Sequence, residues 1–432
     1  MLSHEDNEFL CRIGPGTPMG NLMRQYWIPA IRADEVPAPD CPPLRVRLLG
    51  EDLIGFRTTS GTVGLIQSNC PHRGASLFFG RNEEEGLRCV YHGWKFNTAG
   101  SCVDMPNEPP ESNFKHKIKA VAYPTQERNG IIWAYFGPRE VPPPLPDLEA
   151  TLVNSDPKRI SILHRKCNWM QGWEGEMDTV HAAFLHGGAI RPEGQPPGSF
   201  TRYHYGQRAP RFQVLTTDWG TSYGAYRPAE DDSYYWRIAH MLFPFYAMTP
   251  TGVMGEEAKL NAYVPMDDTH TLQWECIINM VGKEGRGGGG RGPYRETTTD
   301  WYGRFNLVQN MDNDYLIDRE EQRSWKSFTG IPGIRQQDMA VTESMGPIYD
   351  RTREHLGTTD VLIIRTRRRL IQAARALRDQ GIVPPGVDNP EVYRLRSGEV
   401  VMPRDANWWD ASKELRERFD PVPQAAGAIA RQ

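Results

Sequence analysis

Residues 70–94 read CPHRGASLFFGRNEEEGLRCVYHGW, and they are the most informative part of the chain for its N-terminal fold. It contains two short pairs of potential metal ligands, Cys70 with His72 and Cys89 with His92. Each pair is closely followed by glycine, which suits a tight loop turn and a close approach of backbone N–H groups to a bound group. The stretch therefore predicts two loop tips that hold one metal centre between them.

The donor set indicates which centre this is. In a Rieske [2Fe–2S] cluster two cysteines hold one iron and two histidines hold the other. A structural zinc site can use the same four donors, but usually in the order of two cysteines and then two histidines. The mixed pairs favour the cluster, with Cys70, His72, Cys89 and His92 as its ligands. A cluster of this kind carries one electron at a time, so the stretch predicts a redox protein.

Size and composition set broad limits. The 432 residues suffice for two or three domains, and the net charge of −4 gives no basic field for nucleic acid. No apolar run approaches the ~18 residues that a membrane-spanning helix needs. The acidic N-terminus lacks a signal pattern, so we expect a cytoplasmic protein without membrane partners. The seven cysteines are odd in number and scattered, which argues against a disulfide framework.

The pattern of the chain predicts an α+β protein. Short alternating strands with turn signals, among them Arg128-Asn129-Gly130, fill residues 43–136 and predict an antiparallel β domain over residues 41–145. Residues 1–40 are expected to pack on the catalytic domain, and the proline-dense residues 141–150 mark the start of that domain, residues 146–432. There a helical stretch over residues 168–188 precedes strand-like segments between residues 211 and 281 and later helices.

Two further segments have simple interpretations. The glycine-rich residues 282–295 predict a surface loop, because they lack the Gly-Lys-Ser/Thr ending of a phosphate loop. Residues 358–381 predict a helix with an apolar stripe that includes Ile364 and Leu370. The arginines of this helix are expected on its solvated face, where docking of an acidic redox partner is an alternative; they are Arg365, Arg367, Arg368 and Arg369.

A second metal motif is Asp178-x-x-His181-x-x-x-x-His186. Two imidazoles and a later carboxylate form the facial triad of non-haem Fe(II) oxygenases. Residues five apart do not share a helix face, so the histidines converge only if the helix is widened, bent or ends between them. Asp338 is the favoured carboxylate, and spacing alone leaves open four other acids, Asp312, Asp314, Asp318 and Asp360.

These motifs resemble the large (alpha) subunits of the Rieske non-haem iron aromatic ring-hydroxylating oxygenases, in the phthalate dioxygenase branch. The resemblance runs from GPGTPMGNLMRQYW at residues 14–27 to QDMAVTESMGPIYDRTREHLGTTD at residues 337–360. It implies an N-terminal all-β Rieske domain and a C-terminal helix-grip-like antiparallel sheet whose helices carry the mononuclear Fe(II). It selects Asp338 as the third iron ligand. It also makes Asp178 the bridge between His181 and His92 of the partner subunit.

The resemblance further implies a homotrimer or trimer-based assembly. The chain has neither a dinucleotide fingerprint nor a plant-type ferredoxin motif, so electrons must come from a separate NAD(P)H-dependent flavin and iron–sulfur reductase. The implied activity is O2-dependent hydroxylation of an aromatic, carboxylated substrate. The alternatives are a monooxygenase or O-demethylase acting on a methoxy- or phenoxy-arene, a Rieske electron carrier without oxygenase activity, and a zinc-binding protein that is not an enzyme.

The substrate pocket has weaker signals. A carboxylated arene favours an arginine as a bidentate anchor, and the candidates are Arg202, Arg208 and Arg237. Phe243 and Phe245 are candidates for an aromatic pocket wall, although their alternation fits a sheet core equally well.

Overall fold

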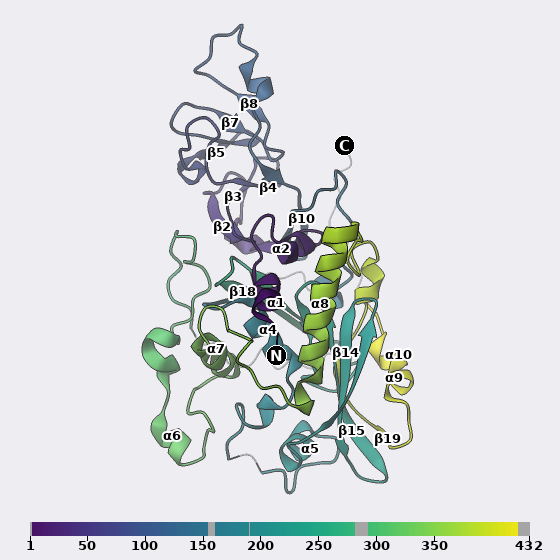
Figure 1. The fold of residues 1–432 in the computed structure, drawn as a ribbon. Helices are drawn as coiled ribbons and strands as arrows, with labels where there is room; N and C mark the ends of the chain where they lie inside the picture. Colours follow the sequence, from purple (N-terminus) through teal and green to yellow (C-terminus); the bar gives the residue numbers. More distant parts are fainter. Residues whose placement is uncertain (1, 154–159, 190, 281–292, 422–432) are drawn as a thin grey trace.

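A computed structural model of the chain describes residues 2–153, 160–189, 191–280 and 293–421. Figure 1 shows small sheets gathered at one end of the molecule and a large sheet with its helices at the other. The glycine-rich stretch at 282–295 lies mostly outside the described residues. Within the described parts, no helix combines the length and the apolarity needed to cross a bilayer.

The far end of the molecule consists of two small antiparallel sheets that share one core. The first contains β2 (Leu44–Leu48), β3 (Glu51–Arg57), β4 (Val63–Gln67) and β9 (Ala122–Tyr123), in that order. The second contains β5 (Arg81–Glu83), β6 (Gly86–Arg88), β7 (Lys95–Phe96) and β8 (Cys102–Asp104). Ile54, Phe56, Leu87 and Phe96 pack between them, together with Cys70 and Cys89. The expected all-β domain is confirmed.

A third sheet connects this end to the rest of the molecule. It has the order β1 (Trp27–Arg32), β11 (Ile131–Tyr135) and β10 (Thr125–Arg128), all antiparallel. Asn129 and Gly130 have φ angles of 49° and 80° in the β10–β11 turn, which is the left-handed backbone that the turn signal predicted. The first helices, α1 (His4–Cys11) and α2 (Pro18–Met23), contact the long C-terminal helix α8 (Val361–Gln380).

One hydrophobic core continues from the N-terminal helices to the large sheet, and it includes Leu10, Ile31, Trp133 and Trp173. The division of the chain at residues 40 and 145 therefore stays a prediction, since packing alone does not divide it there.

The large sheet has eight strands, and helices α3 (Glu149–Val153), α4 (Trp169–Met177) and α8 contact it. Its order is β12, β18, β17, β16, β15, β14 and β13, with β19 paired to β15, and all these pairs are antiparallel. The strands are β12 (Ser161–Arg165), β13 (Arg211–Thr217), β14 (Gly220–Pro228), β15 (Ser233–Leu242), β16 (Tyr246–Met248), β17 (Glu257–Pro265), β18 (Thr271–Asn279) and β19 (Gly398–Pro403). This arrangement confirms the α+β class.

Figure 1 shows α8 running alongside β14, which it contacts. The remaining helices lie elsewhere in this half of the molecule. They are α3 (Glu149–Val153), α4 (Trp169–Met177), α5 (Phe200–Gly206), α6 (Arg319–Arg323), α7 (Ile334–Ser344), α9 (Trp408–Ala411) and α10 (Lys413–Arg416). Helix α8 ends where Gly381 adopts φ 68° and its N–H donates to the carbonyls of Ala376 and Leu377.

The predicted faces of α8 are partly wrong. Ile364 was expected in the apolar stripe but is 39% exposed, whereas Arg367 was expected in solvent and is buried. The cause is an acidic partner that the local sequence does not contain. The Arg367 guanidinium donates a hydrogen bond to Glu174 of α4 at 2.5 Å. Its two terminal nitrogens donate hydrogen bonds to Glu354.

Glu174 joins three segments of the chain. Its carboxylate accepts two hydrogen bonds from Arg351, at 2.9 and 2.8 Å, as well as the bond from Arg367. Burial raises the pKa of Glu174, but the two guanidinium groups outweigh burial and hold this pKa below its ordinary value. Helix α4 is thus fixed to α8 and to the segment that follows α7.

We predict that Glu174→Gln lowers the free energy of unfolding by about 3–5 kcal/mol, because two buried guanidinium groups lose their shared carboxylate. The pKa of Glu174 is depressed in the folded state, so this contribution is present above the ordinary carboxyl pKa of 4.5 and is lost as the pH falls. Denaturant unfolding at neutral pH measures the effect. Asp379→Asn is the control, since the ion pair that the structure describes for Asp379 is with its exposed neighbour Arg378; equal stability of all three proteins would contradict the prediction.

Candidate metal centres

The two loops that carry the predicted cluster ligands have the same backbone. In each loop the cysteine N–H donates to the carbonyl five residues later, and the glycine N–H donates back to the cysteine carbonyl. The bonds are Cys70 to Ala75 (2.8 Å), Gly74 to Cys70 (2.9 Å), Cys89 to Trp94 (2.8 Å) and Gly93 to Cys89 (3.0 Å). Both glycines have positive φ angles, 76° and 80°, which other residues rarely adopt. The loops therefore form a matched pair.

The four predicted donors lie together between these loops. Cys70 and Cys89 are buried and free of disulfides, while the rings of His72 and His92 are partly exposed with centroids 4.4 Å apart. Trp94 stacks on His72 at 4.3 Å. Burial is the main cause that raises the pKa of Cys70 to about 11. A bound metal ion would replace this thiol proton. Two inward thiols and two outward imidazoles fit a [2Fe–2S] cluster.

The second centre depends on how α4 ends. Asn168 caps the start of the helix, and the helix stops at Met177 because Asp178 leaves the helical conformation. The Asp178 carboxylate then accepts hydrogen bonds from the N–H groups of Val180 (2.7 Å) and His181 (3.4 Å), where a short 3-10 turn, His181–Ala183, begins. The predicted helical stretch to residue 188 is therefore wrong beyond Met177. The chain solves the geometric problem by ending the helix before the first histidine.

This turn brings the predicted iron ligands together. Potential ligand atoms of His181, His186 and Asp338 all lie within 4.8 Å of one another. The Asp338 Oδ1 atom is 3.1 Å from His186 Nε2 and 3.6 Å from His181 Nε2. Among the acids that spacing left open, the structure places Asp338, on α7, beside the histidines. Two imidazoles and one carboxylate whose ligand atoms lie this close together fit a facial triad.

The other ring nitrogen of each histidine has its own partner. His186 Nδ1 is 2.7 Å from Gln337 Oε1, and the Gln337 amide nitrogen donates to the Ile331 carbonyl at 2.8 Å. Because that second bond fixes the amide orientation, His186 Nδ1 must carry the proton, which leaves Nε2 free to bind a metal. Likewise, His181 Nδ1 is 3.6 Å from Asp178 Oδ2. Both histidines thus present Nε2 to Asp338.

Buried charges adjust the protonation of these groups. For Asp338 burial is the largest influence and raises the pKa, but His186, His181 and Arg335 together hold it well below its ordinary value. For His181 burial lowers the pKa, whereas Asp178 and Asp338 outweigh burial and raise it. Arg335 Nη1 lies 3.6 Å from Asp338 Oδ2 and 3.4 Å from Glu176. The carboxylate is therefore ionised and ready to bind a cation.

A close backbone contact shapes the rim beside His186. The Phe328 N–H donates to the Gly187 carbonyl at 3.0 Å, and a Cβ on Gly188 would lie 2.5 Å from the Lys326 carbonyl oxygen. Glycine at position 188 therefore lets the segment before α7 approach the iron ligands. Phe184 and Phe328 meet edge to face at this rim, with ring centroids 6.0 Å apart.

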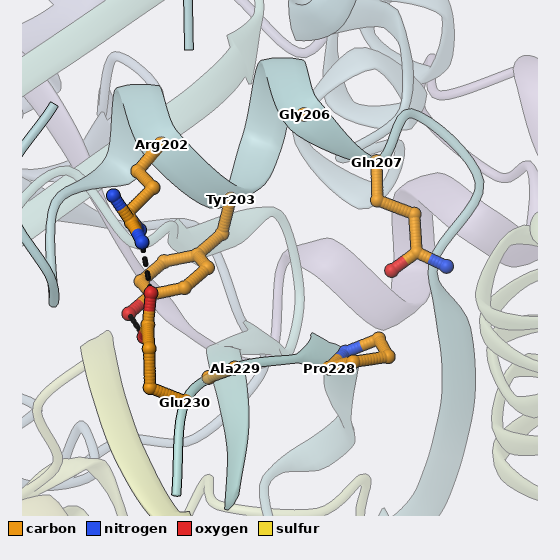
Figure 2. A pocket seen from close by; sticks show the side chains of 7 residues that line it. All are labelled: Arg202, Tyr203, Gly206, Gln207, Pro228, Ala229 and Glu230. Atoms are coloured by element: carbon orange, nitrogen blue, oxygen red, sulfur yellow. Dashed lines mark hydrogen bonds and ion pairs between the residues drawn. The ribbon is translucent and has the colours of Figure 1, made fainter. Parts of the chain in front are cut away.

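The candidate arginines occupy three different environments. Arg202 donates to Glu230 at 2.5 Å, next to a surface hollow of about 360 Å³ that Tyr203 and Gln207 also line (Figure 2). Arg208 is exposed, and its guanidinium lies 5.0 Å from the ring centre of Phe184. Arg237 is buried and donates to Glu399 at 3.0 Å and to the Pro250 carbonyl at 2.8 Å. Their role in substrate binding stays a prediction.

The candidate aromatic wall lies elsewhere. Phe243 and Phe245 are buried in the main core, just beyond the end of β15, where the Phe243 carbonyl accepts the Tyr393 hydroxyl. The described contacts do not bring these two rings to the iron ligands.

Sequence reasoning also missed Gln337 and Arg335, although both lie shortly before Asp338 on α7. Their spacing to Asp338 was visible in the sequence, but the partners that give them a role come from distant segments.

Two family models match the two parts of the chain. Residues 26–123 match the Rieske [2Fe–2S] domain, and residues 134–425 match the family described as LigXa C-terminal domain like. The chain is 45% identical to the 3-chlorobenzoate-3,4-dioxygenase oxygenase subunit of Comamonas testosteroni, over 96% of this chain and 98% of the relative. It is 36% identical to the phthalate 4,5-dioxygenase oxygenase subunit of Pseudomonas putida, over 95% and 94%.

A solved structure supports the fold. Dicamba monooxygenase bound to 3,6-dichlorosalicylic acid superposes with a TM-score of 0.56 at 18% identity, covering 83% of this chain and 100% of that one.

We predict that Gln337→Leu weakens Fe(II) binding by about 10- to 100-fold, because His186 loses the partner that sets its tautomer. Anaerobic titration with Fe(II) measures this, and the absorbance of the cluster should not change. Gln336→Leu is a matched control, since neither side-chain polar atom of Gln336 has a hydrogen-bond partner within the described ranges. An unchanged affinity in Gln337→Leu, or an equal loss in both variants, would contradict the assignment.

Proposed function

The chain belongs to the oxygenase subunits of the Rieske oxygenases, and from this premise we propose that it oxygenates carboxylated arenes at the site of His181, His186 and Asp338. It is an oxidoreductase that binds a [2Fe–2S] cluster and a mononuclear iron. One observation supports the proposed site most directly. The ligand atoms of three side chains lie within 4.8 Å of one another, and neighbouring groups set the protonation of these side chains. When bound, the cluster supplies single electrons and the mononuclear iron activates dioxygen.

The side chains of the chain prepare this site. Gln337 accepts the Nδ1 proton of His186, so that Nε2 stays available, and Asp178 faces His181 Nδ1 in the same way. Arg335 and the two histidines keep Asp338 ionised. The segment before α7 lies against the chain next to His186, through the close approach at Gly188 and the bond from Phe328 to Gly187.

Asp178 has a second proposed role as the link between the two centres. One carboxylate oxygen accepts hydrogen bonds from the N–H groups of Val180 and His181, and the other faces His181 Nδ1. As in the resemblance above, we propose that Asp178 also reaches His92 of the partner subunit in a homotrimer or trimer-based assembly. His92 is partly exposed at a loop tip, which is compatible with such a contact.

The proposed partners follow from what the relatives are called. Both relatives are oxygenase subunits, and a subunit of this kind needs an electron donor. We propose a separate NAD(P)H-dependent flavin and iron–sulfur reductase, and a cytoplasmic location with access to it. 3-Chlorobenzoate and phthalate, which name the two relatives, are both carboxylated arenes, and we propose this class of substrate.

We predict that the purified protein is red-brown and gives a rhombic EPR signal after reduction. With a surrogate reductase and NADH it should consume O2 and hydroxylate at least one of benzoate, 3-chlorobenzoate and phthalate. Oxygen uptake and product analysis by mass spectrometry measure the activity. A colourless protein that contains only zinc would overturn the cluster. Redox cycling without O2 incorporation would favour the electron carrier, and aldehyde release from methoxyarenes alone would favour the O-demethylase.

We predict that Asp178→Asn keeps both metals but lowers turnover by about 10- to 100-fold, because the amide cannot replace the carboxylate between the two imidazoles. The contrasting variant is Asp338→Ala, which should lose mononuclear iron and keep the cluster spectrum. Iron analysis, EPR and steady-state O2 uptake distinguish the two. Full coupled activity in Asp178→Asn would contradict the electron route, and unchanged iron content in Asp338→Ala would point to another acid.

A further inference from the structure

The two oxygens of the Asp338 carboxylate face different groups. Oδ1 faces the histidines, at 3.1 Å from His186 Nε2 and 3.6 Å from His181 Nε2. Oδ2 faces Arg335, whose Nη1 atom is 3.6 Å away. One oxygen is thus placed among the potential metal ligands, and the other lies beside a cation.

The Arg335 guanidinium is held from two other elements of the fold. Its Nη2 donates a hydrogen bond to Glu275 of β18, and its Nη1 donates one to Glu176 of α4 at 3.4 Å. The Arg335 side chain is only 14% exposed, and a guanidinium stays charged and planar in a protein. Arg335 is therefore a fixed positive charge that cannot follow Asp338 if the carboxylate rotates.

Glu176 is fixed in its turn by the large sheet. Its Oε1 accepts hydrogen bonds from the Asn261 amide at 2.7 Å and the Tyr263 hydroxyl at 2.8 Å. Its Oε2 accepts a hydrogen bond from the Thr249 hydroxyl at 3.0 Å. Both carboxylates that anchor Arg335 thus belong to elements that do not carry an iron ligand.

The position of Oδ2 bears on how Asp338 binds a metal ion. A carboxylate binds a metal through one oxygen or through both. Two imidazoles and one carboxylate oxygen leave about half of the coordination sphere open, whereas the second oxygen would occupy a further position. To bind through both oxygens, Asp338 must rotate so that Oδ2 approaches the metal and leaves Arg335. That rotation is unfavourable, because it takes a carboxylate away from a buried cation.

We propose that Arg335 is a positioning residue that retains Oδ2 of Asp338, so that this carboxylate binds the mononuclear iron through Oδ1 alone. The inference rests on the proposed function and deepens it, since it assigns what keeps coordination positions open for dioxygen. The second oxygen of Asp338 is reserved by the fold itself, through a network that begins on the sheet.

The direct test is the crystal structure of the protein loaded anaerobically with Fe(II). In the wild type, Oδ1 of Asp338 should lie at a bonding distance of about 2.0–2.2 Å from the iron, and Oδ2 should stay closer to Arg335 than to the iron. In Arg335→Gln both oxygens should bond to the iron. Equal bonding by both oxygens in the wild type would overturn the inference, and this measurement requires no variant.

The matched control is Lys259→Gln. Lys259 is another buried cation of the same network and donates to Thr249 at 2.8 Å, and no ion pair joins it to Asp338 in the part of the chain that the structure describes. This variant loses a buried charge as Arg335→Gln does, but it should keep binding through one oxygen. Two-oxygen binding in Lys259→Gln as well would show a general effect of buried charge and overturn the role of Arg335.

A spectroscopic measurement in solution complements the crystals. With nitric oxide as a probe of the Fe(II) site, the EPR signal should broaden in oxygen-17-enriched water, because water occupies the open positions. The broadening should be smaller in Arg335→Gln, at iron contents matched by metal analysis, and turnover should fall about 10-fold. Equal broadening in both proteins would contradict the inference.

The remaining outcomes are also decisive. If Arg335→Gln does not fold, Arg335→Met replaces it, since it removes the charge and keeps an extended side chain; one-oxygen binding in the uncharged variant would overturn the inference. Incorporation of O2 by a wild type that binds iron through both oxygens refutes the inference and leaves the oxygenase. One-oxygen binding that depends on Arg335, in a protein that incorporates no O2, supports the inference and refutes the proposed function.

Discussion

The catalytic half of this molecule depends on one geometric constraint: His181 and His186 must present the same ring nitrogen to one point. Five helical residues turn the chain by about 500°, so the two side chains would lie about 140° apart on a continuous helix. Asp178 removes the conflict, because α4 ends there and one carboxylate oxygen accepts hydrogen bonds from the N–H groups of Val180 and His181. Its other oxygen remains for His181. The residue that breaks the helix is therefore also the one that orients the first ligand.

A second requirement follows from burial, because a carboxylate held away from water must be kept ionised by its neighbours. Asp338 has two histidines and Arg335 nearby, and Arg335 in turn contacts Glu176 and Glu275. Glu176 also accepts hydrogen bonds from Asn261 (2.7 Å) and Tyr263 (2.8 Å) of β17. The sheet thus contributes a polar network beneath the metal site as well as an apolar core. Glu174, two residues earlier on α4, binds Arg351 and Arg367 instead. It fixes the helix to α8 and to the segment that follows α7.

The sequence was most informative where function depends on neighbours in the chain. Cysteine and histidine pairs such as Cys70 and His72 are set by single loops, and the strands of both domains follow local alternation, so both could be predicted. Partners from distant segments could not. Nothing near Arg367 shows that Glu174 will bury it, and spacing alone did not distinguish Asp338 from Asp312. The early end of α4 was also hidden, because residues 178–186 contain no proline and only a capping geometry reveals the break.

The same reasoning explains why the arginine candidates differ in value. A sequence shows where guanidinium groups are, but not which of them already have a carboxylate. Arg237 and Arg202 have partners within the fold, so binding a substrate anion would require them to exchange one interaction for another. Arg227 differs from both, because its Nε donates to the Gln207 carbonyl and its terminal nitrogens have no hydrogen-bond partner among the described residues.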